Sequence, residues 1–138
     1  MGSGHHRARR SLGQNFLIDP NLQRRIVAVL GAEAEDTVLE IGPGLGALTD
    51  HLVGRVGRLI LVELDNRLVA DLRERLGGRD DVEIVHADIL SVPLDTVVDD
   101  PTHLLVVGNV PYNITSPIIF HLLTRPRPRR IELMVQKE

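Results

Sequence analysis

The 138-residue chain contains no cysteine and no tryptophan, and its aromatic residues are Phe16, Phe120 and Tyr112 alone. The lack of cysteine excludes disulfides, zinc–thiolate sites and thiol nucleophiles, and it fits a reducing compartment. With so few aromatic rings, we expect a core of Leu, Val, Ile and Ala side chains. A single tyrosine is conspicuous in such a chain.

Long apolar runs and targeting signals are also missing. No run approaches the ~18 residues that a membrane-spanning helix needs. The first residues lack the apolar segment of a signal peptide, and MGSGHH is typical of a tag remnant. We therefore expect a cytoplasmic protein with no membrane partner.

Positive charge is scarce in the middle of the chain and concentrated at its ends. Residues 31–120 carry sixteen acids against six arginines, whereas residues 1–30 and 121–138 are net basic. Basic ends on an acidic body favour a polyanion partner that touches the ends. The alternative is an ordinary solvated surface with compositional drift.

The apolar pattern predicts strands that alternate with helices. This order gives right-handed βαβ units and an α/β fold, a doubly wound and mostly parallel sheet, in which ligands bind beyond the carboxyl ends of the strands. The expected strands are 37–41, 58–64, 81–87, 102–108 and 130–136, and the expected helices are 20–30, 45–53, 66–76 and 116–123.

Local signals mark the helix ends. Asp19 is placed to cap the first helix, and Gly31 is placed to end it. Val29 belongs to the apolar face that we expect this helix to bury. Ser116, followed by Pro117, is the expected N-cap of the last helix.

A glycine-rich turn follows the first strand. Gly42, Gly44 and Gly46 permit a tight turn and a close approach of the backbone to a ligand at a helix N-terminus. Their G-x-G-x-G spacing differs from the G-x-G-x-x-G of dinucleotide enzymes, which argues against NAD. The alternative is an ordinary tight turn between a strand and a helix.

Acidic residues follow the next two strands. Glu63 is placed to accept hydrogen bonds from both hydroxyls of a ribose, while Asp65 caps the following helix. Asp88 is placed to accept from the exocyclic amine of adenine, with Ile89 against the ring; its alternative is a turn-forming role. Together with the glycines, these residues describe an adenosine ligand.

The chain has no triphosphate-binding motif and no lysine before Lys137. The adenosine ligand that needs no phosphate cradle is S-adenosylmethionine, which we therefore predict as the cofactor. No metal site is predicted.

The stretch GNVPYN, residues 108–113, follows the fourth strand. The Asn109 side-chain oxygen and a backbone carbonyl of Val110 or Pro111 can accept hydrogen bonds from an adenine N6 amine and orient it for attack on a methyl sulfonium. Tyr112 can stack on a base that has left its helix, and Pro111 fixes the backbone angle. The alternative is a rigid turn with a surface tyrosine.

Six stretches in order resemble one family: SLGQNFLID, VLEIGPGLGALT, LVELD, ADIL, GNVPYNITSPI and LMVQKE. They are similar to successive motifs of the bacterial KsgA/RsmA-type ribosomal RNA adenine N6,N6-dimethyltransferases, from about residue 10 to residue 138. The resemblance implies a Rossmann-like class I fold. It also implies transfer of methyl groups from S-adenosylmethionine to N6 of two adjacent adenosines in small-subunit (16S) rRNA, late in assembly of the 30S subunit.

The resemblance implies further site residues, which composition and spacing do not indicate. Gln14, Asn15 and Leu17 of QNFL would contact the cofactor beside Gly42, Gly44, Glu63, Asp88, Ile89 and Asn109. Asn109, Pro111 and Tyr112 would hold the target adenine. An RNA-facing basic arm would include Arg7, Arg9 and Arg10.

The family continues beyond the point where this sequence stops. Its Rossmann-like domain has two further strands, followed by a small helical domain. We therefore expect an N-terminal arm over residues 1–18 and a partial methyltransferase domain over residues 19–138, truncated after about five strands. The last strand would then be an unpaired edge, which invites self-association. Cofactor binding would survive better than RNA methylation.

Three alternatives remain open. The first is an erythromycin-resistance-type methyltransferase of large-subunit RNA, and the second is a DNA adenine methyltransferase, which the valine of NVPY disfavours. The third is a non-catalytic RNA-binding or assembly module.

Overall fold

The computed structural model describes residues 18–136, which form one parallel five-stranded sheet in the order β3-β2-β1-β4-β5. This order confirms the predicted α/β architecture. The parallel arrangement brings the carboxyl ends of all strands to one edge of the sheet. The strands are β1 (Thr37–Ile41), β2 (Arg58–Glu63), β3 (Val82–His86), β4 (Leu105–Pro111) and β5 (Arg130–Gln136).

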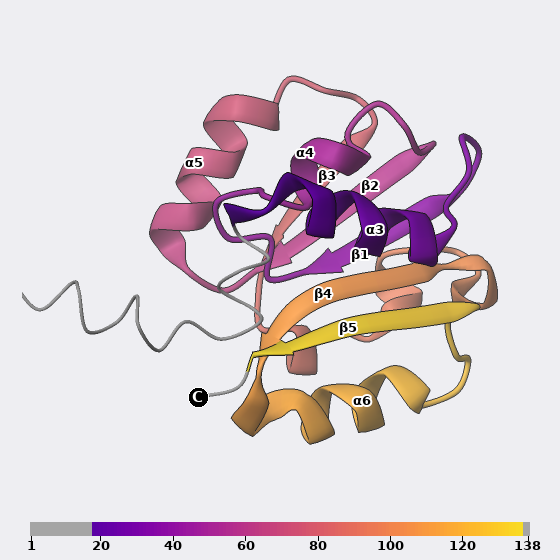
Figure 1. Cartoon of the computed structure of the whole chain (residues 1–138). Coiled ribbons are helices and arrows are strands. Elements are labelled where there is room, and N and C mark those ends of the chain that lie inside the picture. Colours follow the sequence, from indigo (N-terminus) through magenta and orange to yellow (C-terminus); the bar gives the residue numbers. More distant parts are fainter. Residues whose placement is uncertain (1–17, 137–138) are drawn as a thin grey trace, which may run out of the picture.

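Helices cover both faces of the sheet (Figure 1). One face carries α3 (Pro20–Leu30), α4 (Thr49–Leu52) and α5 (Asn66–Leu76), and the other carries α6 (Thr115–Leu123). Short 3₁₀ turns η1 (Ile89–Ser91), η2 (Leu94–Thr96), η3 (Pro101–His103) and η4 (Tyr112–Ile114) connect the elements around α6. Within residues 18–136, no helix is both long and apolar enough to cross a membrane.

Alternation along the strands builds two aliphatic core layers. Val38 of β1 packs with the α3–α5 layer, and its neighbour Leu39 packs with the α6 layer. Both are fully buried, as are Leu105 and Val106 at the paired positions of β4. Because successive side chains of a strand point to opposite faces, each central strand contributes to both layers.

The predicted helix caps at Asp19 and Asp65 are confirmed. The Asp19 carboxylate accepts from the backbone N–H groups of Asn21 and Leu22. The Asp65 carboxylate likewise caps the first turn of α5. Gly31 ends α3 in the left-handed conformation at φ 68°, which glycine adopts without steric cost.

The predicted burial of Val29 is wrong. Val29 is 64% exposed, whereas Gln23 of the same helix is buried and pairs with the His51 ring through a 2.8 Å hydrogen bond. The side of α3 that meets α4 is therefore partly polar. The spacing of apolar residues alone predicts the wrong buried side for this helix.

Two predicted boundaries are also wrong. The helix expected at 45–53 forms over Thr49–Leu52, because Gly42, Gly44 and Gly46 have positive φ values and the chain runs through turns before it. The last helix begins at Thr115, with Ile114 at the N-cap position and no side-chain cap, so Ser116 lies inside the helix.

The fourth strand extends further than expected. It begins at Leu105 rather than residue 102, and it continues through Asn109 to Pro111 because β5 pairs with it along its whole length. Asn109 and Pro111 thus belong to the last residues of a paired strand, which restricts their backbone more than a loop would.

Candidate functional site

A hollow of about 220 Å³ lies where the carboxyl ends of β1, β2, β3 and β4 meet. Thirteen of the described residues line it: six that the sequence predicted as site residues and seven apolar ones from the strand ends, from η4 and from α6. The hollow therefore joins segments that are far apart in the chain. The six predicted residues are Gly42, Glu63, Asp88, Ile89, Asn109 and Pro111.

Glu63 closes the glycine-rich turn against the end of β2. Its buried carboxylate accepts the Gly44 N–H at Oε1 and the N–H groups of Leu64 and Asp65 at Oε2, each at 3.0 Å. The Gly42 N–H donates to the Val62 carbonyl at 2.9 Å. Gly44 thus does not line the hollow but is held beside it through Glu63.

The three backbone donors leave Glu63 little free acceptor capacity. A carboxylate offers about four lone-pair positions, and three N–H groups already occupy positions on Glu63. Pairing with both hydroxyls of a ribose would therefore require one donor to yield. The Gly44 N–H is the donor that comes from a different segment of the chain.

Asp88 has the turn-forming role that was one of its two predicted interpretations. Its Oδ1 accepts the Leu90 N–H at 3.0 Å and caps η1. The carboxylate also lines the hollow, and Ile89 beside it is buried in the apolar wall. Capping and adenine recognition are compatible, because a carboxylate can accept from several donors.

Asn109 places an unpaired acceptor at the hollow. Its side-chain oxygen Oδ1 is buried and has no hydrogen-bond partner among the described residues. Leaving a buried acceptor unpaired costs about 1–3 kcal/mol, so such an atom calls for a specific explanation. A donor supplied by a ligand would remove this penalty.

The rest of the GNVPYN stretch lies around that acceptor. The Pro111 carbonyl accepts the Thr115 hydroxyl at 2.9 Å, so an incoming amine would share this oxygen or use that of Val110. Tyr112 begins η4 and is 63% exposed. It is not among the residues that line the hollow, although Pro111 directly before it is.

Gly108 lets β4 lie close to β1 at the base of the site. It is paired with Ile41, and a Cβ atom at position 108 would lie 2.8 Å from the Ile41 carbonyl oxygen. Real Cβ atoms do not approach backbone so closely. Gly42, which follows β1, and Asn109 of β4 are therefore held side by side.

Glu40 lies in β1 directly below the glycine-rich turn and was not among the predicted site residues. Burial raises the pKa of its carboxyl from 4.5 to about 8, against the opposing effect of a 2.6 Å hydrogen bond from the Thr49 hydroxyl; Asp50 and Glu63 raise it further. An acid inside an apolar strand next to a glycine-rich turn is the signal that would have identified it.

Leu64 was also missed. It is 62% exposed and lines the hollow directly after Glu63. An apolar residue that follows the proposed ribose acid at a strand end was the available signal, because a flat ring beside the ribose needs an apolar surface.

Some predicted residues lie outside the described range. These are Gln14, Asn15 and Leu17 of the QNFL segment and Arg7, Arg9 and Arg10 of the basic arm. Among residues 18–136, no group of three or more His, Asp or Glu side chains is placed to hold a metal ion.

Comparison with known proteins identifies the family of the chain. The family model described as "Ribosomal RNA adenine dimethylase" matches residues 5–138. A "Ribosomal RNA small subunit methyltransferase A" of Moorella thermoacetica is 48% identical over 94% of the chain and 48% of its own length. The protein of the same name from Geobacillus thermodenitrificans is 42% identical over 94% of the chain and 46% of its own length.

Solved structures show the same fold. The "23S rRNA methyltransferase ErmE" matches with a TM-score of 0.72 and 34% identity over 86% of the chain and 46% of its own. A "dimethyladenosine transferase from Plasmodium falciparum" gives the same TM-score and chain coverage at 30% identity, over 42% of its own length. The chain spans about half the length of the curated relatives it matches. It belongs to the ribosomal RNA adenine dimethylase family.

Proposed function

We propose that the chain is the cofactor- and adenine-binding part of an S-adenosylmethionine-dependent enzyme that dimethylates N6 of two adjacent adenosines in small-subunit rRNA. Family membership and the names of the curated relatives support the reaction and the subunit. The immature 30S subunit would be the partner, and the cytoplasm the place of action.

The residues around the hollow fit the adenosine part of the cofactor. Glu63 would accept from the ribose, Asp88 from the adenine amine, and Ile89 and Leu64 would supply apolar surface. The hollow is smaller than the ~300–1,000 Å³ of sites that bury a drug-sized ligand. The remainder of the cofactor would lie along the turn formed by Gly42 and Gly44, with contacts from Gln14, Asn15 and Leu17.

The acceptor half of the site follows from Asn109. S-adenosylmethionine, when bound, supplies an electrophilic methyl group. The Asn109 oxygen and a carbonyl of Val110 or Pro111 would accept hydrogen bonds from the adenine N6 amine and direct its lone pair toward that methyl group. The N–C bond forms as the S–C bond breaks, and the amine proton leaves to water. Tyr112 would stack on the target base.

The observation that carries the proposal is the buried, unpaired Oδ1 of Asn109 beside the cofactor hollow. A titration calorimeter tests the first half of the proposal with S-adenosylmethionine. Absence of binding heat would contradict it. The second half is tested by tritiated methyl transfer to immature small subunits, where we expect weak activity from this chain, because the curated relatives are about twice as long.

Large-subunit rRNA is the second candidate substrate, because a "23S rRNA methyltransferase" is among the similar structures at 34% identity. Parallel assays on isolated large- and small-subunit RNA separate the two. Methylation of large-subunit RNA alone would reverse the assignment. Cofactor binding without transfer to either RNA would favour a non-catalytic RNA-binding module.

Self-association through β5 is part of the same proposal. Within residues 18–136, β5 pairs with β4 alone and lies at the edge of the sheet. Such an edge offers unpaired N–H and C=O groups to another strand. Light scattering should show dimers or larger species that grow with protein concentration. A monomer at all concentrations would contradict this part.

A further inference from the structure

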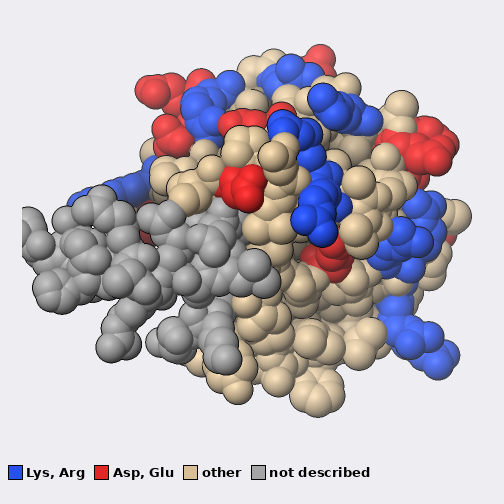
Figure 2. All heavy atoms as spheres, in the orientation of Figure 1, with Lys and Arg blue, Asp and Glu red and all other residues tan. Residues whose placement is uncertain are grey.

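A second, larger hollow lies at the opposite end of the sheet from the cofactor hollow. Its volume is about 820 Å³, and it is formed by the link between α6 and β5 together with η3. In Figure 2, basic atoms lie at the edge of the molecule where α6 leads into β5, whereas the surface over α6 carries no charge. We call this hollow the arginine cleft; its charged residues are Arg125, Arg127, Arg129 and Arg130.

Two of the arginines hold the cleft in place. Arg130 donates from Nη1 to the carbonyls of Val29 and Leu30 at the end of α3, at 3.1 and 3.2 Å. Arg129 pairs with Asp36 at 3.3 Å, and its backbone N–H donates to the Leu104 carbonyl at 2.8 Å. These contacts tie the end of the link to α3 and to the segment before β4.

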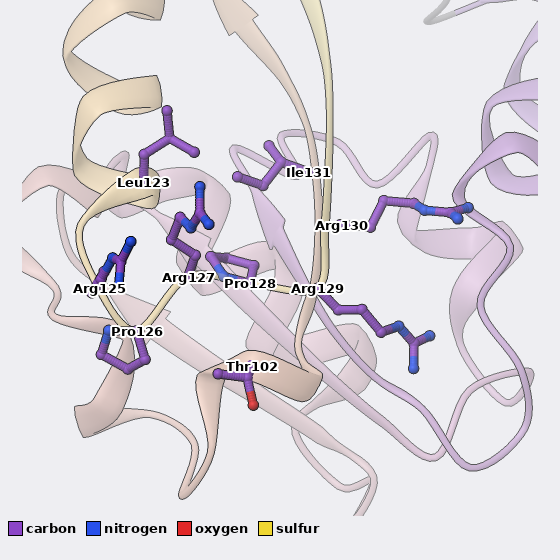
Figure 3. Close-up of a pocket in the computed structure, with 9 residues that line it drawn as sticks. All are labelled: Thr102, Leu123, Arg125, Pro126, Arg127, Pro128, Arg129, Arg130 and Ile131. Atoms are coloured by element: carbon purple, nitrogen blue, oxygen red, sulfur yellow. The ribbon is translucent and has the colours of Figure 1, made fainter.

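The other two arginines have no such role. Arg125 and Arg127 are exposed, and neither guanidinium forms a hydrogen bond or ion pair with another residue of the described range. Figure 3 shows both on the α6 side of the link, while Arg129 and Arg130 extend to the other side. These two charges are available to a ligand.

The link is also stiff and lacks acidic residues. Pro126 and Pro128 alternate with the arginines, and proline fixes the backbone angle φ. No Asp or Glu of the described residues lines the cleft itself; Asp36 beside it pairs with Arg129, and Asp95 lines a separate, smaller hollow together with Arg125. A ligand would therefore meet positive charge on a backbone that loses little freedom on binding.

We propose that the arginine cleft binds the sugar–phosphate backbone of the substrate RNA, as a second contact away from the target adenosine. This inference rests on the proposed RNA substrate. Guanidinium groups match phosphate oxygens in paired hydrogen bonds and are preferred in nucleic-acid recognition. Contacts of this kind fix the orientation of the RNA without reading its sequence.

The position of the cleft supports a separate contact. Arg130 pairs with Leu105 at the start of β4, whereas Pro111 at the cofactor hollow ends that strand. Six residue steps of about 3.3 Å place the two hollows about 20 Å apart. A neighbouring stretch of the folded RNA, rather than the methylated nucleotide, would occupy the cleft.

A protein partner is less suited to this surface. Protein interfaces have an apolar core that is depleted in charge. Here the large apolar side chains of the lining are Leu123 and Ile131, against four arginines. An acidic protein is nevertheless a definite alternative outcome of the test.

The test is the salt dependence of RNA binding by the Arg125→Gln/Arg127→Gln double variant. The probe is labelled small-subunit rRNA, followed by fluorescence anisotropy. Loss of two phosphate contacts should reduce the slope of log K against log salt by about 1.4–1.8. Affinity for S-adenosylmethionine and thermal stability should stay unchanged, since neither side chain is bonded within the described structure.

The matched control is Arg55→Gln/Arg73→Gln, which removes the same charge from exposed arginines outside the cleft. It should change the slope much less. Equal slopes for both double variants would contradict RNA binding at the cleft but not the proposal that RNA is the substrate. Competition by polyglutamate as strong as that by RNA would also overturn it, in favour of an acidic protein. Absence of RNA binding by the unmodified chain would contradict the cleft and the RNA substrate together.

Discussion

The two ends of the same sheet carry hollows of opposite character. At the carboxyl ends, the buried Glu63 carboxylate is held by three backbone N–H groups, and the buried Asn109 oxygen lies unpaired beside an apolar wall. At the amino ends, exposed arginines are carried on a proline-stiffened link. The first arrangement gives precise geometry, and the second gives charge that depends little on exact position. Substitutions at the first should therefore act on chemistry and cofactor affinity, and those at the second on salt-dependent binding.

The largest effect is expected at Asn109. Asn109→Ala should lower methyl transfer about 10²–10³-fold, the range for loss of one preorganised hydrogen-bonding group, as measured with tritiated cofactor. The free energy of unfolding should not fall, because the lost oxygen has no partner.

Asn113→Ala is the matched control, since Asn113 is exposed and does not line the hollow. Equal transfer rates for the two variants would remove Asn109 from the mechanism.

The next effect is expected at Glu63. Glu63→Gln keeps the size of the side chain but turns an acceptor into a donor among backbone N–H groups. We expect cofactor affinity to fall about 10–100-fold, as for hydrogen bonds to a charged group. Calorimetry measures this, with the exposed Glu74→Gln as control. Unchanged affinity would mean that Glu63 only holds the turn.

The raised pKa of Glu40 predicts that the free energy of unfolding depends on pH. Between pH 4.5 and about 8 the folded chain keeps a proton on Glu40 that the unfolded chain has released. The free energy of unfolding should therefore decrease as pH rises through this range, by at most about 1.4 kcal/mol per pH unit.

Glu40→Gln should flatten this pH dependence in urea denaturation measured at several pH values. The Thr49 hydrogen bond can be retained by the amide oxygen. A variant whose profile still follows that of the unmodified chain would place the titration elsewhere.

The smallest effect is expected in the arginine cleft, where Arg130 and Arg127 should differ in their contribution to stability. Arg130→Ala should lower the free energy of unfolding by about 1 kcal/mol, because two carbonyls at the end of α3 lose their donor. Arg127→Ala should leave it unchanged within error. Chemical denaturation compares the two, and equal losses would show that Arg127 also has a structural role.

The sequence predicted what depends on local signals and strand ends. The alternation of strands and helices, the caps at Asp19 and Asp65 and the grouping of Glu63, Asp88 and Asn109 at the strand ends follow from the apolar pattern, from local signals and from the parallel sheet. These features need no knowledge of the packing between helices.

What depends on tertiary contacts was not predictable. The burial of Gln23 in place of Val29 is set by α4, and the continuation of β4 to Pro111 is set by pairing with β5. The arginine cleft was seen in the sequence as basic charge near the end of the chain. Its division into anchored and free arginines required the positions of α3 and Asp36.

The close contact at Gly108 has a consequence for engineering this site. The lack of a side chain at Gly108 sets how closely β4 approaches Ile41, and with it the distance between Asn109 and the glycine-rich turn. A single methyl group at position 108 would act as a spacer that moves Asn109 away from the glycine-rich turn without altering any group that contacts a ligand. Gly108→Ala should thus slow methyl transfer more than it weakens cofactor binding, and an equal loss of both would contradict this view.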